Sequence, residues 1–235
     1  ILLGLVGSEM CIRDRYAGSL VPREILSIVP KEAKLIDTSD LTMKQIEQLY
    51  IRAKELNVDV ARVHSGDVSV YGALSEQINL LQKHNIDFQI VPGIPAYVEA
   101  AAQLKTELTA PGQVQSVVLT RTSFGSTPMP EGEDLKTFAK TGATLVIHLS
   151  IRRLNYIYRE LTPILGDDAL VAVLYRIGWP DQQIILDRLD NIASKVREKK
   201  ITRTALIITG KNFKKKSDIN SVLYDENFNH LFRPK

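Results

Sequence analysis

Two short breaks between an apolar strand and a helix restrict the fold of this chain more than any other feature. The first covers residues 62–72, which read RVHSGDVSVYG, and the second covers residues 90–96, which read IVPGIPA. Each pattern predicts a strand end, a tight turn and a helix start. Because ligands of parallel α/β sheets bind outside the carboxyl ends of the strands, we expect the functional site at these turns.

The first residues of the chain differ in character from the rest. Residues 5–15, LVGSEMCIRDR, resemble one translated frame of a transposase adapter used in sequencing libraries. The alternative is a genuine leader. Its apolar stretch is broken by Glu9, is shorter than the ~20 residues of a membrane span, and lacks the basic start and cleavage site of a secretory signal. We therefore set residues 1–15 aside as a non-native leader.

Composition excludes several classes of protein. The single cysteine, Cys11, lies in the leader, so disulfides and thiolate metal sites are not expected, which suits a cytoplasmic protein. The net charge of +3 is too small to predict a nucleic-acid partner. No apolar stretch is long enough to cross a bilayer, so we expect no membrane partner.

Strand and helix patterns alternate along the chain, which favours an α/β fold of two domains. Strands are expected at residues 60–64, 88–91, 117–120, 143–149, 171–175 and 205–209, and helices at 46–56, 73–84, 96–104, 153–161 and 189–196. Thr42 and Gln45 form a capping-box pattern before the first of these helices. The expected domains are residues 16–110 and 111–211, followed by a tail at 212–235. The Gly- and Pro-rich residues 123–132 read as a long, functional loop.

The two turns carry residue types suited to ligand binding. Gly66 allows a ligand to approach the backbone closely, and the neighbouring amides favour a carboxylate or phosphate. Asp67 is open to three interpretations: part of that site, a partner for a cationic group, or the N-cap of the following helix. Residues 92–95 could equally form a plain rigid turn.

Other kinds of site are not indicated by the sequence. The glycine and lysine spacings of dinucleotide-binding and P-loop motifs are missing, and no serine lies in a nucleophile elbow. The histidines are scattered without ligand partners at a recognisable interval, so no metal is expected. Their positions are His64, His84, His148 and His230. His64 and His148 lie at expected strand ends and read as structural or substrate-facing groups.

With these motifs, the chain resembles the tetrapyrrole methylase superfamily, and within it the precorrin-4 C(11)-methyltransferases of cobalamin biosynthesis. Residues 62–67 are similar to the family's first cofactor turn and residues 91–95 to its second. Further similar segments lie at 16–21, 119–122, 128–133, 148–150, 175–176, 179–181, 202–206 and 223–233. The family opens with a strand and a loop reading Gly-x-Gly-Pro-Gly-Asp, and nothing like it precedes Tyr16. We therefore expect an incomplete copy that lacks this segment.

The resemblance implies two α/β domains with S-adenosylmethionine bound in the cleft between them. The residues implied to bind this cofactor are Ser65, Gly66, Asp67, Val70, Pro95, Ala96, Leu149, Ile177, Thr204 and Ala205. The implied reaction is methylation of precorrin-4 at C-11 to give precorrin-5. Methyl transfer depends mainly on orienting two bound reactants, so no acid–base pair is required.

The substrate implied by the resemblance is a polycarboxylate macrocycle, and arginine matches carboxylates bidentately. The candidate substrate-binding residues are Arg121, Arg152, Arg153 and Arg176. His148 and Tyr71 are candidates to accept a proton or hold a propionate. The family also implies a homodimer. The alternatives are the cobalt-precorrin-4 enzyme, a methylase of ribosomal RNA or a translation factor, and a noncatalytic cofactor- or tetrapyrrole-binding fragment.

Overall fold

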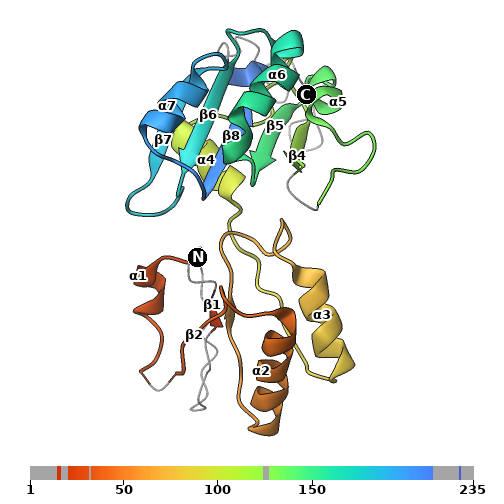
Figure 1. Cartoon of the computed structure of the whole chain (residues 1–235), viewed down its shortest axis with the longest axis vertical. Coiled ribbons are helices and arrows are strands. Elements are labelled where there is room, and N and C mark those ends of the chain that lie inside the picture. The colour runs from red at the N-terminus through yellow and green to blue at the C-terminus, as the bar shows by residue number, and fades with distance from the viewer. Residues whose placement is uncertain (1–14, 17–20, 32, 124–126, 214–227, 229–235) are drawn as a thin grey trace. The chain divides into compact units, whose positions relative to one another are not determined.

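The computed structural model describes residues 15–16, 21–31, 33–123, 127–213 and 228 of the chain. The chain separates into two compact units, Ile1–Ala96 and Tyr97–Lys235 (Figure 1). This division differs from the boundary at residue 110 expected from the sequence. Thr144 Oγ1 donates a hydrogen bond to the carbonyl of Leu108 at 2.7 Å, and Asn212 Nδ2 donates to the carbonyl of Glu107 at 2.9 Å. These bonds attach residues 107 and 108, which lie before the expected boundary, to the second unit.

The first unit contains a parallel three-stranded sheet in the order β2-β1-β3. The strands are β1 (Arg15–Tyr16), β2 (Ile36–Asp37) and β3 (Arg62–Val63), and the helices are α1 (Arg23–Leu26), α2 (Met43–Glu55) and α3 (Leu74–Lys83). Arg15, which the sequence analysis assigned to the leader, pairs with Ile36 and Arg62 in this sheet. The turn at residues 64–72 follows the carboxyl end of β3, as predicted.

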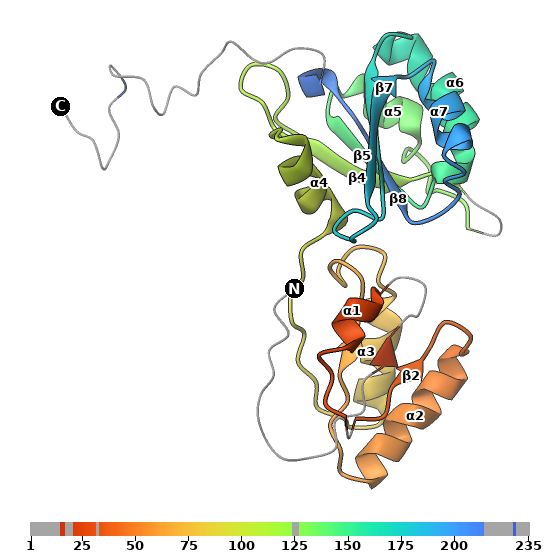
Figure 2. The ribbon, with the colours of Figure 1, turned by 90° about the vertical axis from the view of Figure 1, so that its left-hand side faces the viewer.

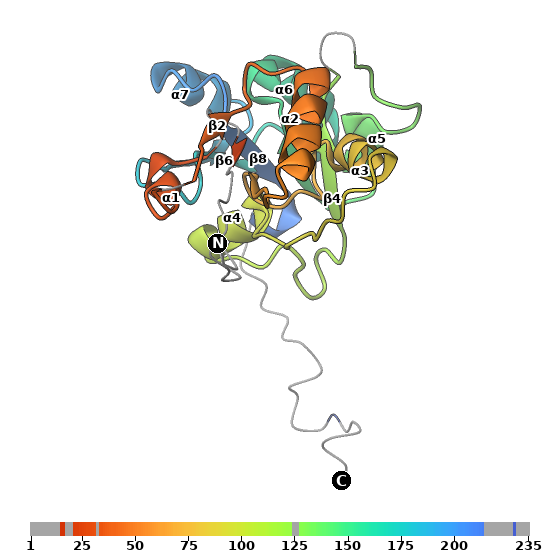
Figure 3. The ribbon, with the colours of Figure 1, turned by 90° about the horizontal axis from the view of Figure 1, so that it is seen from below.

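Helices α2 and α3 lie side by side (Figures 1 and 3). Tyr50 of α2 donates a hydrogen bond to Gln77 of α3 at 3.1 Å, and Glu47 of α2 contacts Lys83 at 2.8 Å. The predicted capping box of α2 is confirmed: Thr42 and Gln45 each bond the backbone of the other. Because α2 precedes β3 and α3 follows it, these contacts stabilise the segments on both sides of the strand.

The strand expected at residues 88–91 is not formed, so that prediction was wrong. Residues 86–95 contain no strand, and Val91 is 54% exposed. A strand needs a hydrogen-bonded neighbour. In the described part of the first unit, the three strands of the sheet pair only with one another. The apolar pattern of residues 88–91 therefore did not lead to a strand, because no neighbouring strand pairs with it among the described residues.

The second unit is built on a five-stranded mixed sheet in the order β4-β5-β8-β6-β7. Its strands are β4 (Val117–Arg121), β5 (Thr144–His148), β6 (Leu170–Tyr175), β7 (Gln183–Arg188) and β8 (Ala205–Thr209). β4 and β5 are parallel, whereas β8 runs antiparallel to both β5 and β6. The start of β8 therefore lies at the same edge of the sheet as the ends of β5 and β6.

Helices cover both faces of this sheet (Figure 2). α4 (Ala96–Leu104) lies on one face, and α5 (Leu135–Lys140), α6 (Leu154–Leu165) and α7 (Ile192–Glu198) lie on the other. Short 3-10 turns occur at η1 (Ile151–Arg153) and η2 (Lys211–Phe213). Ile147 and Ile207 of the sheet are fully buried with Leu161 of α6 in the main hydrophobic core. This core fixes the strand ends that carry the candidate residues.

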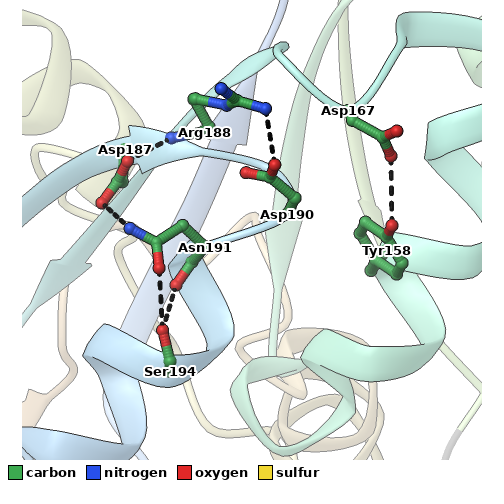
Figure 4. A network of polar contacts seen from close by, with 7 residues as sticks. All are labelled: Tyr158, Asp167, Asp187, Arg188, Asp190, Asn191 and Ser194. Carbon is green, nitrogen blue, oxygen red and sulfur yellow. Dashed lines mark hydrogen bonds and ion pairs between the residues drawn. The ribbon is translucent and has the colours of Figure 1, made fainter.

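Two elements of the second unit were not predicted, β7 and α5, and α7 begins later than expected. A polar network at the end of β7 explains the late start (Figure 4). Asn191 Nδ2 donates to Asp187 Oδ2 at 2.8 Å, and Ser194 Oγ donates to the carbonyl of Asn191 at 2.7 Å. These bonds hold residues 189–191 as a turn, so the helix starts at Ile192.

Candidate functional site

In the first unit, the carboxylate of Asp67 joins the two predicted turns. Its Oδ1 accepts hydrogen bonds from the backbone amide of Ser69 at 2.9 Å and from the Ser69 hydroxyl. Its Oδ2 accepts from the backbone amide of Gly93 at 2.7 Å. These bonds, the one from the Ser69 hydroxyl first, lower the pKa of Asp67 below its usual value. Asp67 is therefore an anion that fastens one turn to the other.

The backbones of the two turns also touch directly. A Cβ added at Gly93 would lie 1.9 Å from the carbonyl oxygen of Gly66. Gly66 itself has a left-handed backbone, with φ +68°, and the position of its missing Cβ is 3.7 Å from the amide of Ala96. Glycine is needed at position 93 because any side chain there would push the turns apart, and it is favoured at position 66 because the backbone there is left-handed.

Asp67 does not cap the following helix, so one of its three interpretations is excluded. The N-cap of α3 is Ala73, which has a left-handed backbone and no side-chain capping bond. Tyr71, the candidate proton acceptor in this unit, also has a positive φ of 55° and an exposed side chain. Val70 lies between Asp67 and Tyr71 in the sequence, and its amide donates to the carbonyl of Asp67 at 3.4 Å.

His64 lies at the end of β3 and is half-buried. Burial lowers its pKa, with a smaller contribution from the charge of Arg62. Arg62 donates hydrogen bonds to Thr38 at 2.5 Å and to Gln77 at 3.2 Å. The neutral form of His64 is therefore favoured, which agrees with a structural or ligand-facing role and not with an anion site.

In the second unit, the sheet brings most of the remaining candidates to one edge. Arg121 at the end of β4 pairs with His148 at the end of β5, and Tyr175 at the end of β6 pairs with Ala205 at the start of β8. The candidates gathered at this edge, or next to it in sequence, are Arg121, His148, Leu149, Arg152, Arg153, Arg176, Ile177, Thr204 and Ala205. We call this the candidate edge.

Three non-glycine residues at the candidate edge have left-handed backbones. The φ angles are 53° for Leu149, 47° for Arg176 and 52° for Thr204. Such conformations are costly for residues with a Cβ, most of all for a β-branched residue such as threonine. Leu149 is in addition 69% exposed. Strained backbone concentrates at ligand sites, so the candidate edge has the features of a binding site.

His148 is half-buried at the end of β5, and this burial lowers its pKa to about 4. The adjacent chain is fixed by a hydroxyl network. Ser150 Oγ donates to the carbonyl of His148 at 2.7 Å and accepts from the backbone amide of Thr122 at 2.8 Å. His148 is therefore a neutral, well-positioned imidazole at physiological pH, able to accept a proton but not to attract a propionate by charge.

The four candidate arginines have different surroundings. Arg121 donates to the carbonyls of Thr122, Thr127 and Pro128 at 3.2 to 3.3 Å, and so holds the loop after β4. Arg176 lies 3.8 Å from the ring centroid of Trp179 and 2.5 Å from a carboxylate oxygen of Asp181.

Arg152 and Arg153 are adjacent residues in η1. Arg152 donates to the carbonyl of Thr202 at 3.0 Å. Arg153 lies over the ring of Tyr156 at 4.8 Å. Among the described residues neither arginine has a carboxylate within salt-bridge distance, so both guanidinium groups remain available to an anionic ligand.

Several residues that shape these sites were not singled out from the sequence. They are the amide of Gly93, the hydroxyls of Ser69, Thr122 and Ser150, and the stacking and pairing partners Trp179 and Asp181. The family resemblance had identified the segments that contain Gly93, Thr122, Ser150, Trp179 and Asp181, which was the available signal. Within the described residues no group of three potential metal ligands occurs, and no helix has the length and hydropathy of a membrane span.

Comparison with known families decides what kind of protein carries these sites. The sequence profile of the Tetrapyrrole (Corrin/Porphyrin) Methylases matches residues 8–193. The chain belongs to this family. Its match includes both turns and most of the candidate edge, and it begins inside residues 1–15. The α/β architecture expected from the sequence is confirmed by this membership and by the solved relatives below.

Named relatives cover nearly the whole chain. A precorrin-4 C(11)-methyltransferase of Sinorhizobium sp is 44% identical over 93% of this chain and 86% of its own length. A cobalt-precorrin-4 C(11)-methyltransferase of Methanocaldococcus jannaschii is 39% identical over 93% of this chain and 84% of its own length. Among solved structures, a cobalt precorrin-4 methyltransferase superposes with a TM-score of 0.81 at 31% identity, covering 86% of this chain and 84% of that one.

A more distant solved relative shares the fold alone. The uroporphyrin-III C-methyltransferase of Thermus thermophilus superposes with a TM-score of 0.69 at 22% identity, with 88% of each chain covered. That protein was solved in complex with S-adenosyl homocysteine.

Proposed function

We propose that this methylase transfers a methyl group from S-adenosylmethionine to C-11 of precorrin-4, giving precorrin-5 in cobalamin biosynthesis. The observation that carries this proposal is the identity of 42–44% to precorrin-4 C(11)-methyltransferases from several bacteria, each over more than nine-tenths of this chain. At the level of the reaction class, the chain is a C-methyltransferase of the tetrapyrrole family.

The groups available in this chain fit S-adenosylmethionine. The turns of the first unit offer main-chain groups on a rigid surface, because the absence of a Cβ at Gly66 and Gly93 lets the two turns pack directly against each other. The candidate edge offers the exposed apolar side chain of Leu149 beside the backbone of Thr204 and Ala205, which suits a flat, largely apolar base. The residues proposed to form the cofactor site, by contact or by positioning another residue, are Ser65, Gly66, Asp67, Val70, Pro95, Ala96, Leu149, Ile177, Thr204 and Ala205.

When bound, this cofactor supplies an electrophilic methyl group on a sulfonium. The protein's own contribution is mainly orientation, which can be worth on the order of 7–11 kcal/mol. In our proposal the rigid turns of the first unit and the strained candidate edge of the second each orient the groups that they bind. His148 stays neutral and is the candidate acceptor for the proton that the methylated macrocycle loses, but its lowered pKa makes it a weak base, so the methyl transfer in this proposal does not depend on it.

Arginines at the candidate edge are proposed to bind the carboxylates of the macrocycle. Arg176 is held rigid by Trp179 and Asp181, and a pre-oriented guanidinium loses little freedom when it binds a carboxylate. Arg152 and Arg153 lie next to one another after β5 and present charge at the same edge. Arg121 is proposed to act by holding the loop that follows β4.

The second candidate is the cobalt-bound form of the same substrate. The 39% identity to the Methanocaldococcus jannaschii enzyme and the 31% identity to a solved cobalt precorrin-4 methyltransferase both favour it. We propose the cobalt-free substrate because the five precorrin-4 relatives are 42–44% identical.

The two substrates can be tested in one experiment. The purified chain is incubated with labelled S-adenosylmethionine and either precorrin-4 or cobalt-precorrin-4, and the macrocycle is analysed by mass spectrometry. We expect one added methyl group and a higher kcat/KM for precorrin-4. Faster transfer to cobalt-precorrin-4 favours the second candidate, and label in neither macrocycle rejects both.

The assembly and the cellular location follow from the family resemblance. We propose a homodimer in the cytoplasm that acts on a small-molecule tetrapyrrole, without nucleic-acid or membrane partners. Sedimentation velocity tests the homodimer, because a homodimer has twice the mass of the 26.3 kDa chain. Cell fractionation tests the cytoplasmic location.

A further inference from the structure

Asp67 stands in the turn proposed to bind the cofactor, yet its carboxylate oxygens bond the protein itself. Oδ1 accepts from the amide and hydroxyl of Ser69, two residues along the chain. Oδ2 accepts from the amide of Gly93 at 2.7 Å, across a gap of 26 residues in sequence. Only the second bond joins separate segments.

The region around this bond is packed backbone to backbone. The carbonyl of Gly66 occupies the space that a side chain at Gly93 would need, at 1.9 Å from an added Cβ. The amide of Ala96 and the carbonyl of Ile94 approach Gly66 within 3.7 Å of its own absent Cβ. Such an approach of two main chains leaves polar groups to be satisfied, and the Asp67 carboxylate satisfies one of them.

We propose that Asp67 is a positioning residue: by binding the Gly93 amide it locks the two turns into one rigid ligand-binding surface, and it serves the cofactor through Gly93 and not by contact. The inference rests on the proposed function, since it assumes that both turns bind S-adenosylmethionine. It deepens that function by giving the acidic residue of the first turn a role in preorganisation. A charge-assisted bond to an amide is strong enough for this role.

The competing role is a direct contact between Asp67 and the amino group of the ligand. The two roles differ in how affinity depends on the ligand. A direct contact to the amino-acid portion is lost only for ligands that have this portion. A misplaced turn weakens every ligand that uses both turns.

The experiment measures dissociation constants by calorimetry for S-adenosylhomocysteine and for methylthioadenosine, which lacks the amino-acid portion. Asp67→Asn is expected to weaken both ligands by the same factor, roughly 10-fold. Asp67→Glu keeps the charge but displaces the carboxylate, and is expected to weaken both equally as well. It also serves as the second variant if Asp67→Asn does not fold.

Asp134 offers a matched control in the second unit. It accepts from the amide and hydroxyl of Thr137 at 2.8 and 2.7 Å, the same two kinds of donor that Ser69 offers Asp67, but it caps α5 and has no hydrogen bond to a distant segment among the described residues. Asp134→Asn should lower the melting temperature without changing either dissociation constant. Ser69→Ala should likewise keep affinity, because the bond to Gly93 remains.

The bond itself has a spectroscopic signature. In the ligand-free protein, the amide resonance of Gly93 should move upfield and exchange faster with solvent in Asp67→Asn, and stay unchanged in Ser69→Ala and Asp134→Asn. A loss of affinity for S-adenosylhomocysteine alone, or no loss at all, overturns the proposal. So does an unmoved Gly93 resonance. Wild-type protein that binds neither ligand instead rejects the proposed function, and the inference with it.

Discussion

The backbone amide of Arg176 donates a hydrogen bond to the carbonyl of Thr204 at 2.8 Å, and both residues have left-handed backbones. The bond continues the pairing of β6 with β8 by one step, just where the strands end. Each left-handed residue costs roughly 1–2 kcal/mol. The left-handed residues therefore lower the stability of the second unit at the candidate edge, as expected if this edge binds a ligand.

Replacing Leu149 with glycine should separate stability from binding. Leu149→Gly removes the left-handed strain and little buried surface, since the side chain is 69% exposed. The second unit should be unchanged or stabilised by up to about 1 kcal/mol. Affinity for S-adenosylhomocysteine should fall roughly 10-fold because the apolar contact is lost. Urea unfolding and calorimetry measure the two effects.

Lys200 provides the control for this variant. It has a left-handed backbone of φ 54° just after α7 and is not one of the candidate residues. Lys200→Gly should stabilise by a similar amount, as glycine is favoured after a helix end, and should leave affinity unchanged. Equal affinity loss in both variants, or none in Leu149→Gly, would contradict the role of Leu149.

The contact of Gly93 with Gly66 leads to a prediction about the first unit. Gly93→Ala inserts a Cβ 1.9 Å from a backbone oxygen, so the turns must separate, and we expect at least a 100-fold loss of S-adenosylhomocysteine binding, about 2.7 kcal/mol. Gly142→Ala is the control: its φ of +75° strains the backbone of an alanine, but the nearest atom to the added Cβ is the flexible end of Lys211 at 3.4 Å, so no backbone has to move. Binding by Gly142→Ala should remain normal, and retained binding by Gly93→Ala would refute the account of these turns.

Arg176 should contribute to substrate binding more than to turnover. Arg176→Gln removes a guanidinium that Trp179 and Asp181 hold in position, so the KM for precorrin-4 should rise about 10-fold with a smaller change in kcat. Arg188→Gln is a matched control, because Arg188 is also paired with an aspartate but lies opposite the start of β6, at the far edge of the sheet. A similar KM for both variants would argue against substrate binding by Arg176.

His148 should make the second unit less stable in acid. Burial lowers its pKa from 6.5 to about 4, so between these values the unfolded chain binds the additional proton. The free energy of unfolding therefore decreases as pH falls through this window, on the order of 1–2 kcal/mol after allowance for partial exposure.

The measurement uses the fluorescence of Trp179, the single tryptophan of the chain and a residue of the second unit. Urea unfolding at several pH values should show a shallower pH dependence in His148→Gln than in the wild type. The same slope in both proteins would show that the histidine is not buried in its neutral form.

The sequence predicted the local features well and the long-range ones poorly. The helix at residues 96–104 and the capping box of α2 depend on neighbouring residues, and the structure confirms both. The strand expected at 88–91 failed because a strand also depends on a partner elsewhere in the chain. The edge strand β7 was missed because its exposed and half-buried residues follow no clean apolar alternation.

The same distinction applies to the candidate site. The glycines and Asp67 could be recognised as parts of turns, but the bond from Gly93 to Asp67 spans 26 residues and is set by the fold. The gathering of Leu149, Arg176 and Thr204 depends on β8 running antiparallel between β5 and β6. Their left-handed backbones have no sequence signature, since none of the three is glycine or asparagine.

The most direct test of the proposed reaction follows a single carbon. The chain is incubated with precorrin-4 and S-adenosylmethionine carrying a ¹³C-labelled methyl group, and the macrocycle is examined by NMR. We predict one enriched methyl resonance, assigned to C-11. An enriched methyl at another ring position, or an unlabelled macrocycle recovered from folded protein that binds S-adenosylhomocysteine, would contradict it.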